Sequence, residues 1–276
     1  MNQSYINYLK ASKKSPQTIE LYTNYINRFL NWIGKDETEV TFTDIVDYQA
    51  SLETAPATIC THLASLKSYY GFLKKAGIVA VNPAEEIEKP KVNSKPKHYM
   101  DKDMITAMVA NARTSRDKAI ILFYATTGVR VSELINITLE DYYNSCETHE
   151  ITILGKGNKK RVVYVNTQVR EAIEAYLKDR AKYNCPYLFM GFQGRQMRKE
   201  SLSRTLKCVA RNAGIPFWED ISNHAMRSAF ATIASENGVP VDTIKEAMGH
   251  ANLKTTSIYI KNTQKNINNA MASMVF

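Results

Sequence analysis

The segment HEITILGKGNKKRVVYV, residues 149–165, interrupts a chain whose other patterned segments are helical. Two apolar runs rich in β-branched residues, 151–154 and 162–165, flank a stretch of glycine, asparagine and lysine. Such runs joined by a Gly/Asn turn are typical of a β-hairpin. The segment therefore predicts one small antiparallel sheet inside a mainly α-helical domain.

Helical periodicity appears on both sides of this hairpin. Residues 115–127 include a continuous apolar stretch, so the helix that they predict is expected to be buried, and Gly128 ends it. After the hairpin, apolar residues recur at helical spacing in four segments: 167–180, 199–214, 222–238 and 240–249. Residues 100–276 are therefore predicted to form a mixed, mainly helical domain.

Residues 1–88 predict a separate domain made only of helices. Ser15 followed by Pro16 is a typical helix start, and apolar residues then recur at helical spacing up to Leu30. Two further helical segments follow, residues 42–52 and 55–77. The fold class expected for the whole chain is therefore mostly α.

A basic segment, residues 89–99, is the predicted linker between these two domains. Four lysines and two prolines fall between Lys89 and Lys97, with no acidic residue among them. Proline disfavours regular structure and like charges favour an extended chain. The segment is either an inert spacer or a basic strap that crosses a phosphate backbone.

The composition points to a polyanionic partner. The formal net charge is +9, which favours nucleic acid over a membrane surface. No apolar run approaches the roughly 18 residues that span a bilayer, and the N-terminus lacks the apolar core of a signal peptide. We therefore expect a cytoplasmic protein without a membrane partner. The four cysteines are scattered and show no C-x-x-C spacing, so reduced thiols are expected rather than a zinc or redox site.

Two short motifs before and within the hairpin carry candidate functional side chains. In TTGVRVSEL, Arg130 follows a helix break and Glu133 lies three residues later, which suits either a structural ion pair or a rigid fork for phosphate. In GKGNKKR, Lys156 lies in the predicted turn, where it is either turn chemistry or an arm that reaches into a site. The glycines do not match a P-loop, which argues against an ATPase.

Two more motifs follow toward the C-terminus. In NHAMRSAF, Ser222 is the expected N-cap, and His224 and Arg227 share one helix face. This pair is unlike a metal site, because arginine is not a metal ligand. In AMGHANLKTTSIYI, Gly249 is expected to end a helix, His250 follows in a turn, and Tyr259 comes nine residues after His250. Taken singly, each of these residues is commonly structural.

Taken together, TGVRVSEL, GKGNKKR, HAMRSAFAT and MGHANLKTTSIY resemble the motifs of the tyrosine recombinases, or phage integrases, in the expected order. The resemblance covers nearly the whole chain and is closer to two-domain, Xer-like enzymes than to integrases with an added arm-binding domain. It implies a helical, SAM-like core-binding domain followed by a catalytic domain. Met226 and Ser228 depart from the residues common in the family, but neither change removes a catalytic group.

The resemblance also implies a reaction and a set of site residues. The implied catalytic residues are Arg130, Lys156, His224, Arg227, His250 and the nucleophile Tyr259, with Glu133 supporting the first arginine. A tyrosine hydroxyl would attack a DNA phosphodiester and form a 3′-phosphotyrosyl link. The arginines would stabilise the phosphorane-like charge, His224 would accept the phenol proton, and Lys156 would protonate the leaving oxygen. Because the covalent link conserves the energy of the phosphodiester bond, no cofactor and no metal are expected.

The implied partners are double-stranded DNA at a specific recombination site and further copies of the chain. A homo-tetramer on DNA is expected, with the apolar C-terminal tail of one protomer docking on its neighbour. The residues expected to contact DNA are Thr61, His62, Lys67, Lys89, Lys91, Lys95, Lys97, Arg195, Arg198, Lys199 and Arg204. Most of these would be phosphate contacts, which give affinity and salt dependence rather than sequence specificity.

Two other functions compete with site-specific recombination. A type IB topoisomerase-like enzyme would cleave and rejoin DNA without pairing two sites. A DNA-binding regulator without catalysis would need no intact catalytic set. The biological role also stays open between chromosome dimer resolution, integration or excision of a mobile element, and inversion.

Overall fold

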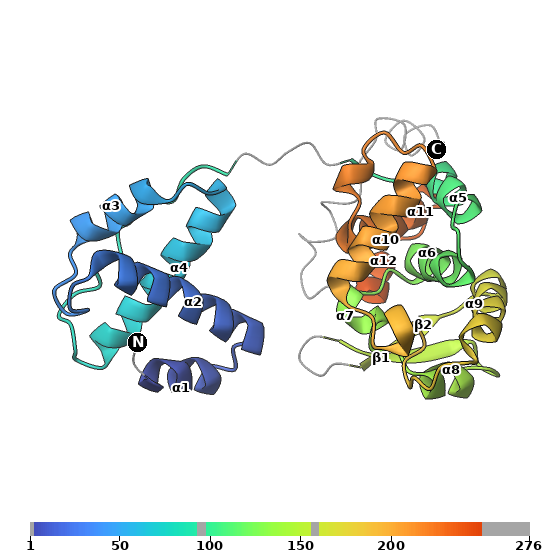
Figure 1. Ribbon diagram of the computed structural model, residues 1–276, viewed down its shortest axis with the longest axis horizontal. Coiled ribbons are helices and arrows are strands. Elements are labelled where there is room, and N and C mark those ends of the chain that lie inside the picture. The colour runs from blue at the N-terminus through green and yellow to red at the C-terminus, as the bar shows by residue number, and fades with distance from the viewer. Residues whose placement is uncertain (1–2, 93–97, 156–159, 250–276) are drawn as a thin grey trace, which may run out of the picture. The chain divides into compact units, whose positions relative to one another are not determined.

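The computed structural model describes residues 3–92, 98–155 and 160–249. The chain divides into two compact units, Met1–Pro96 and Lys97–Phe276, each with its own hydrophobic core (Figure 1). The division falls inside the basic segment 89–99 that is predicted to be the linker. Within the described ranges, no helix combines the length and the apolarity that crossing a bilayer would require.

The described part of the first unit is built from four helices (Figure 1). They are α1 (Gln3–Ala11), α2 (Pro16–Ile33), α3 (Phe42–Ser51) and α4 (Pro56–Lys75). The predicted start of α2 is confirmed, because the Ser15 side chain accepts a hydrogen bond from the Thr18 amide and Pro16 is the first helical residue. Helix α1 is not among the predicted elements, since it spans only two turns and buries only Tyr5 and Leu9.

The core of the first unit is rich in aromatic side chains. Tyr5 meets Tyr69 edge to face, with ring centroids 5.0 Å apart, and Phe29 meets Tyr48 in the same way at 5.0 Å. Helix α4 supplies much of this core through buried aromatic and leucine side chains. Such edge-to-face pairs add to the stabilisation from burying the rings.

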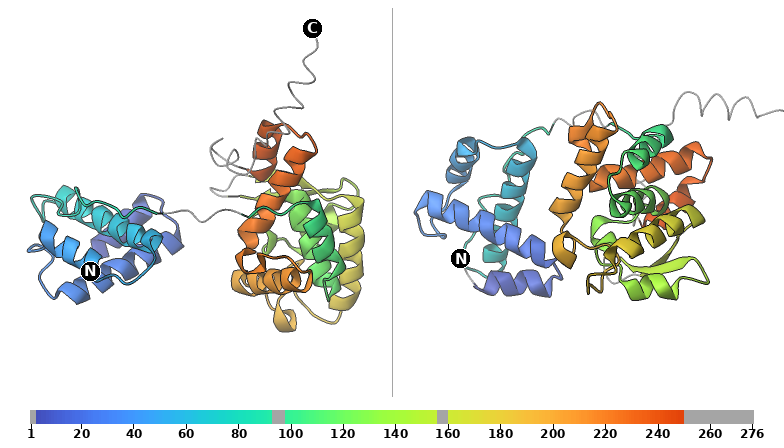
Figure 2. Two further views of the ribbon diagram at one scale, coloured as in Figure 1. Left: turned by 90° about the horizontal axis from the view of Figure 1, so that it is seen from above. Right: turned by 45° about the vertical axis from the view of Figure 1, so that its right-hand side comes forward.

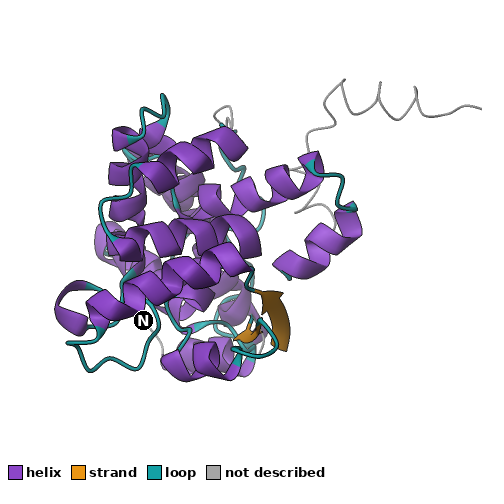
Figure 3. Ribbon diagram, turned by 90° about the vertical axis from the view of Figure 1, so that its right-hand side faces the viewer, coloured by secondary structure: helices purple, strands orange, loops and turns teal. Residues whose placement is uncertain are grey.

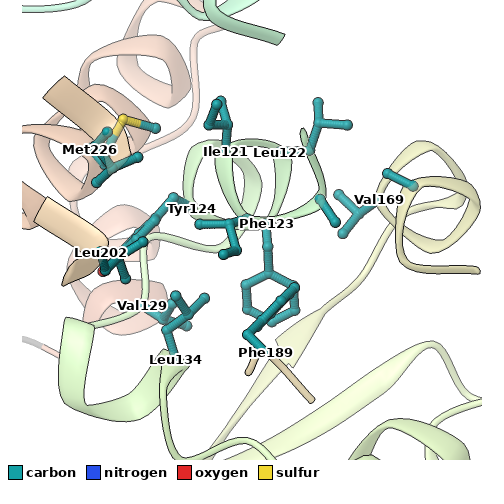
Figure 4. Packing of buried hydrophobic residues seen from close by; sticks show 14 of the residues in the cluster. Ile121, Leu122, Phe123, Tyr124, Val129, Leu134, Val169, Phe189, Leu202 and Met226 are labelled. Atoms are coloured by element: carbon teal, nitrogen blue, oxygen red, sulfur yellow. The ribbon is translucent and has the colours of Figure 1, made fainter. Parts of the chain in front are cut away.

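The second unit is mainly helical, and its helices surround α6 (Ser115–Thr127) (Figures 1 and 2). Helix α6 packs against α5 (Lys102–Ala110), α9 (Thr167–Arg180) and α11 (Asn223–Glu236). Its residues from Ala119 to Tyr124 are all buried, as the continuous apolar run predicts. In Figure 4, Phe123 points toward Phe189 and Tyr124 lies beside Met226 and Leu202, so one helix joins several sides of the core.

The predicted hairpin is confirmed. Strands β1 (Glu150–Leu154) and β2 (Lys160–Tyr164) form a two-stranded antiparallel sheet, with Ile151 opposite Val163. Figure 3 shows this sheet at the edge of an otherwise helical unit. Ile151, Ile153 and Val163 are buried and alternate with exposed residues, which is the pattern of a sheet with one face on a core.

The remaining described elements of the second unit are short or lie toward the C-terminus. They are α7 (Val131–Leu134), α8 (Leu139–Asn144), η2 (Phe192–Gly194), α10 (Lys199–Asn212), η3 (Trp218–Asp220) and α12 (Val241–Met248). Helix α12 is fixed against α11 by a small apolar cluster of Ala231, Ile244 and Met248. This cluster packs the C-terminal end of α12, at Met248, against α11.

Candidate active site

The site begins at the junction between α6 and α7. Gly128 ends α6 with φ +58°, and its amide donates to the carbonyl of Tyr124. A Cβ at this position would collide with the ring of Phe230, so only glycine fits both the left-handed conformation and the space. The turn places Arg130 directly before α7, with its guanidinium partly exposed.

Glu133 organises this junction through four hydrogen bonds. Its carboxylate accepts from the backbone N–H of Arg130 at 2.6 Å and from Arg130 Nη1 at 2.9 Å. It also accepts from Nη1 and Nη2 of Arg161 at 2.8 and 2.7 Å. The side chain is only 3% exposed, so a buried carboxylate is held between two guanidinium groups. The predicted support of Arg130 by Glu133 therefore has a geometric basis.

This environment lowers the pKa of Glu133 to about 2. Burial alone would raise the pKa, but hydrogen bonds and charge from Arg161, the backbone amide of Arg130 and its guanidinium outweigh burial. The charged carboxylate is therefore strongly favoured in the folded protein.

The Glu133→Gln variant is expected to be less stable at neutral pH. Because the folded pKa lies below the unfolded value, the stabilisation is complete above about pH 5 and is lost as the pH falls toward 2. A pKa lowered from 4.5 to about 2 corresponds to about 3 kcal/mol of stability.

Urea unfolding at pH 7, 4 and 3 tests this expectation. The free energy of unfolding should be lower for the variant than for wild type, and this gap should narrow as the pH falls. Glu171→Gln, the same change on the exposed side of α9, is the control and should show a small gap at each pH. A gap for Glu133→Gln that does not change with pH would contradict this account.

Arg227 lies on α11 and is 4% exposed. The helix starts as predicted, with the Ser222 side chain accepting from the amide of Ala225 at 3.2 Å. Arg227 donates through Nη1 to the carbonyl of Gly128 and through Nη2 to the carbonyl of Met248. It therefore connects the α6–α7 junction with the end of α12.

Three arginines converge on the last carbonyls of α12. Arg161 Nε donates to Ala247 O at 3.1 Å, Arg227 to Met248 O, and Arg130 Nη2 to Gly249 O at 2.7 Å. The C-terminal end of a helix carries partial negative charge, so cations there are stabilising. Gly249 ends α12 at φ +64°, as predicted, and a Cβ there would press on Arg161. The structure thus brings the predicted Arg130 and Arg227 together immediately before His250.

Arg161 is the residue that sequence reasoning missed. It lies in the GKGNKKR motif, in which only Lys156 is a predicted site residue. A signal was present, because Arg161 lies two residues before the buried Val163 and therefore on the same, inward face of the second strand. An arginine on the buried face of a hairpin requires a partner, and here the partner is Glu133.

His224 lies in the first turn of α11 and is exposed, whereas Arg227 one turn later is buried. Its carbonyl accepts from the Ser228 side chain at 2.8 Å, which gives that departure from the family pattern a structural role. Met226, the other departure, is part of the core. Lys156, His250 and Tyr259 lie outside the described residues, as does the C-terminal tail.

The structure contradicts the predicted DNA contact of His62. This side chain is 1% exposed, bonds Tyr48 Oη through Nδ1 at 3.0 Å, and stacks on Tyr25 with centroids 3.7 Å apart. Burial also lowers the pKa of His62, which disfavours the charged form that a phosphate would prefer. The helical period of α4 turns His62 inward, next to the buried Leu63.

The other predicted DNA contacts that fall on described residues lie at or near the surface of their own unit. Thr61 is half-buried and its hydroxyl donates to the carbonyl of Ala57 at 3.0 Å. Lys67 is exposed and forms an ion pair with Glu85 at 3.1 Å. Six further basic residues are exposed: Lys89, Lys91, Arg195, Arg198, Lys199 and Arg204. Lys95 and Lys97 lie outside the described residues.

The arrangement favours an anionic ligand. The cluster contains three guanidinium groups, those of Arg130, Arg161 and Arg227, and one carboxylate, that of Glu133, so it is net positive. Arginine forks suit the geometry of phosphate oxygens. Within the described ranges, no three His, Cys, Asp or Glu side chains gather as metal ligands would.

Comparison with known proteins gives a family for both units. The sequence profile of the Phage integrase family matches residues 98–266, and the profile of its N-terminal SAM-like domain matches residues 2–76. The tyrosine recombinase XerA of Pyrococcus horikoshii is 34% identical over 273 residues, which cover 98% of this chain and 91% of that protein.

Solved structures support the same fold. The XerH site-specific recombinase, bound to a palindromic difH substrate, superposes with a TM-score of 0.76 at 18% identity, over 96% of this chain and 82% of that one. The Tn1549 transposon integrase, in complex with a circular intermediate DNA, superposes with a TM-score of 0.75 at 17% identity, over 99% and 98% of the two chains. The chain therefore belongs to the phage integrase family and is an Xer-like tyrosine recombinase, an enzyme of site-specific DNA recombination.

Proposed function

We propose that this recombinase cleaves and rejoins double-stranded DNA through a 3′-phosphotyrosyl intermediate on Tyr259. The observation that carries the proposal is the meeting of Arg130 and Arg227 at the end of α12, one residue before His250. The two arginines that would bind the phosphate therefore bond to the chain just before the segment that contains His250 and the proposed nucleophile, Tyr259.

The arginines would act on the phosphate. As the phenol oxygen attacks phosphorus, negative charge builds on the two non-bridging oxygens, and guanidinium groups fixed in advance stabilise that charge. Glu133 keeps Arg130 oriented, and carbonyl contacts keep Arg227 in place. His250 would hydrogen-bond a non-bridging oxygen or position the nucleophile.

Two protons must also move. A phenol with a pKa of about 10 is mostly protonated at neutral pH, so a base must take its proton, and the exposed His224 is the proposed acceptor. The leaving 5′-oxygen is more basic than a phenolate and needs a donor, for which Lys156 on the β1–β2 hairpin is proposed. The new phosphotyrosyl ester conserves the energy of the phosphodiester bond. Religation by the reverse steps would thus need neither ATP nor metal.

DNA binding would use basic residues of both units. The net charge of +9 and the exposed Arg195, Arg198, Lys199 and Arg204 support a phosphate-binding role, and the similar Tn1549 integrase has been solved with DNA. Contacts of this kind make affinity fall steeply with salt concentration. We also propose that the enzyme acts in the cytoplasm, where it would reach DNA.

The proposed reaction is tested on the enzyme's own site. Sequencing the DNA fragments that the protein retains identifies the site, and a nicked substrate built on it traps the covalent intermediate. We expect a protease-sensitive protein–DNA adduct joined to the 3′ end at the break. A site near the chromosome terminus would indicate dimer resolution, and a site at the end of a mobile element would indicate integration or excision. A bound site that is never cleaved would instead favour a DNA-binding regulator.

Recombination is further proposed to require a homo-tetramer, joined by exchange of the C-terminal tail. Deleting residues 265–276 is expected to abolish recombination between two sites while cleavage of a single nicked site continues. The two assays are run on the same preparation, so that cleavage is the internal control for folding. If the truncated enzyme still recombines paired sites, tail exchange is wrong. If the full-length enzyme relaxes supercoiled plasmids that lack paired sites, the topoisomerase-like alternative is favoured.

A further inference from the structure

The contacts of Arg161 are unusual for a residue outside the predicted catalytic set. Its guanidinium fork binds both oxygens of Glu133, and its Nε donates to Ala247 O. The side chain is 14% exposed, so most of it is enclosed by the protein. It therefore joins three segments: strand β2, the α6–α7 junction and the end of α12.

We propose that Arg161 is a positioning residue of the cleavage reaction, acting on Arg130 through Glu133 and on the end of α12 through Ala247. This role rests on the proposed function, in which Arg130 stabilises the transition state. Arg161 itself is not assigned a contact with DNA.

The action on Arg130 follows from how the carboxylate oxygens are shared. Oε1 of Glu133 accepts from Nη1 of Arg130 and from Nη1 of Arg161. Oε2 accepts from the backbone N–H of Arg130 and from Nη2 of Arg161. A bidentate fork fixes the plane of a carboxylate. Without Arg161, the plane that orients the guanidinium of Arg130 would be held only from one side.

The action on α12 follows from the order of the carbonyls. Arg161, Arg227 and Arg130 bond to the carbonyls of residues 247, 248 and 249, one arginine to each. Removing the first of these bonds leaves the end of α12 held by the two arginines that must also serve the phosphate. Because His250 follows Gly249 in the chain, we expect a shift of this helix end to misplace a catalytic group.

The experiment measures single-turnover cleavage of the nicked site at saturating enzyme, together with DNA affinity at several salt concentrations. Arg161→Gln is expected to lower the cleavage rate about 10- to 100-fold. Affinity for DNA and its salt dependence should stay close to wild type, because Arg161 is not assigned a phosphate contact. Loss of a phosphate contact would instead reduce the salt slope by about 1. Arg161→Lys keeps the charge but not the fork, so its rate should fall between those of wild type and Arg161→Gln.

A double-mutant cycle separates a role through Glu133 from an independent one. If Arg161 acts mainly through Glu133, the enzyme with both Arg161→Gln and Glu133→Gln should cleave about as fast as Glu133→Gln alone. Because the bond of Arg161 to Ala247 O remains in Glu133→Gln, the double variant should lose a little more activity than Glu133→Gln, but less than the product of the two single losses. Losses that multiply in full would overturn the action of Arg161 on Arg130 through Glu133. A changed salt slope for Arg161→Gln would overturn the proposal, since it would show a direct phosphate contact.

Arg180→Gln is the matched control for a purely structural arginine. Arg180 is 4% exposed and donates through Nη2 to the carbonyls of Cys185 and Tyr187, with no bond to the cluster around Glu133. The Arg180→Gln change should lower the thermal midpoint of unfolding, while the folded enzyme keeps its cleavage rate.

The comparison with this control decides whether Arg161 acts on cleavage. If Arg161→Gln behaves like Arg180→Gln, Arg161 is structural only and the proposal fails. If Arg161→Gln does not fold, a wild-type rate in Arg161→Lys overturns the proposal. Absence of an adduct with the wild-type enzyme would instead count against the proposed function itself.

Discussion

The Arg227→Lys enzyme is expected to cleave its DNA site about 10²- to 10³-fold more slowly than wild type. Lysine retains the charge but cannot bridge two acceptors with a planar fork. Arg227 already spans the carbonyls of Gly128 and Met248, so its orientation depends on that fork. The rate should fall even at saturating DNA, because the lost interaction belongs to the transition state.

Burial makes a stability control necessary for this variant. Arg227 is 4% exposed, so its replacement will also lower the thermal midpoint. The Arg180→Gln enzyme, which loses an equally buried arginine bonded to two carbonyls, shows what destabilisation alone does to cleavage. A folded Arg227→Lys enzyme with a wild-type cleavage rate would show that cleavage does not depend on the guanidinium of Arg227.

The elements of the site that depend on local chemistry could be predicted from the sequence. Gly128 and Gly249 both end helices in the left-handed conformation, and Ser222 caps α11, as their neighbours in the chain indicate. The hairpin could be predicted for the same reason, because two runs rich in β-branched residues flank a turn of glycine, asparagine and lysine.

What depends on packing between distant segments could not be predicted. Arg161 lies 28 residues from Glu133 and 86 from Ala247, so no local pattern shows that it joins them. His62 shows the opposite error, since a polar residue on a basic helix suggests the surface but is buried against Tyr25 and Tyr48. In both cases, tertiary contacts decide which way a polar side chain faces.

The functional prediction nevertheless rests on the order of the four motifs along the chain. Arg130 and Arg227 are 97 residues apart in the sequence, yet both bond to consecutive carbonyls at the end of α12. Each arginine alone suits a structural ion pair or a carbonyl contact. Their meeting, just before His250 in the sequence, is the observation on which the proposed phosphate-cleaving site rests.

The identity of the nucleophile is the central claim, and the Tyr259→Phe enzyme tests it. Removing the phenol oxygen leaves no atom to form the phosphotyrosyl bond, so the adduct should fall by about 10⁴-fold or more. DNA affinity should stay near wild type, because the binding residues are unchanged. Tyr143→Phe, at a tyrosine that is 55% exposed on α8, is the matched control and should form the adduct normally.

The most direct measurement is the site of attachment in the trapped complex. Wild-type enzyme is incubated with the nicked site, and the covalent complex is digested with protease. The peptide that carries DNA is then identified by mass spectrometry. The account predicts DNA on Tyr259 in the wild-type enzyme and no adduct in Tyr259→Phe. DNA attached to any other residue, or an adduct that persists in Tyr259→Phe, would contradict it.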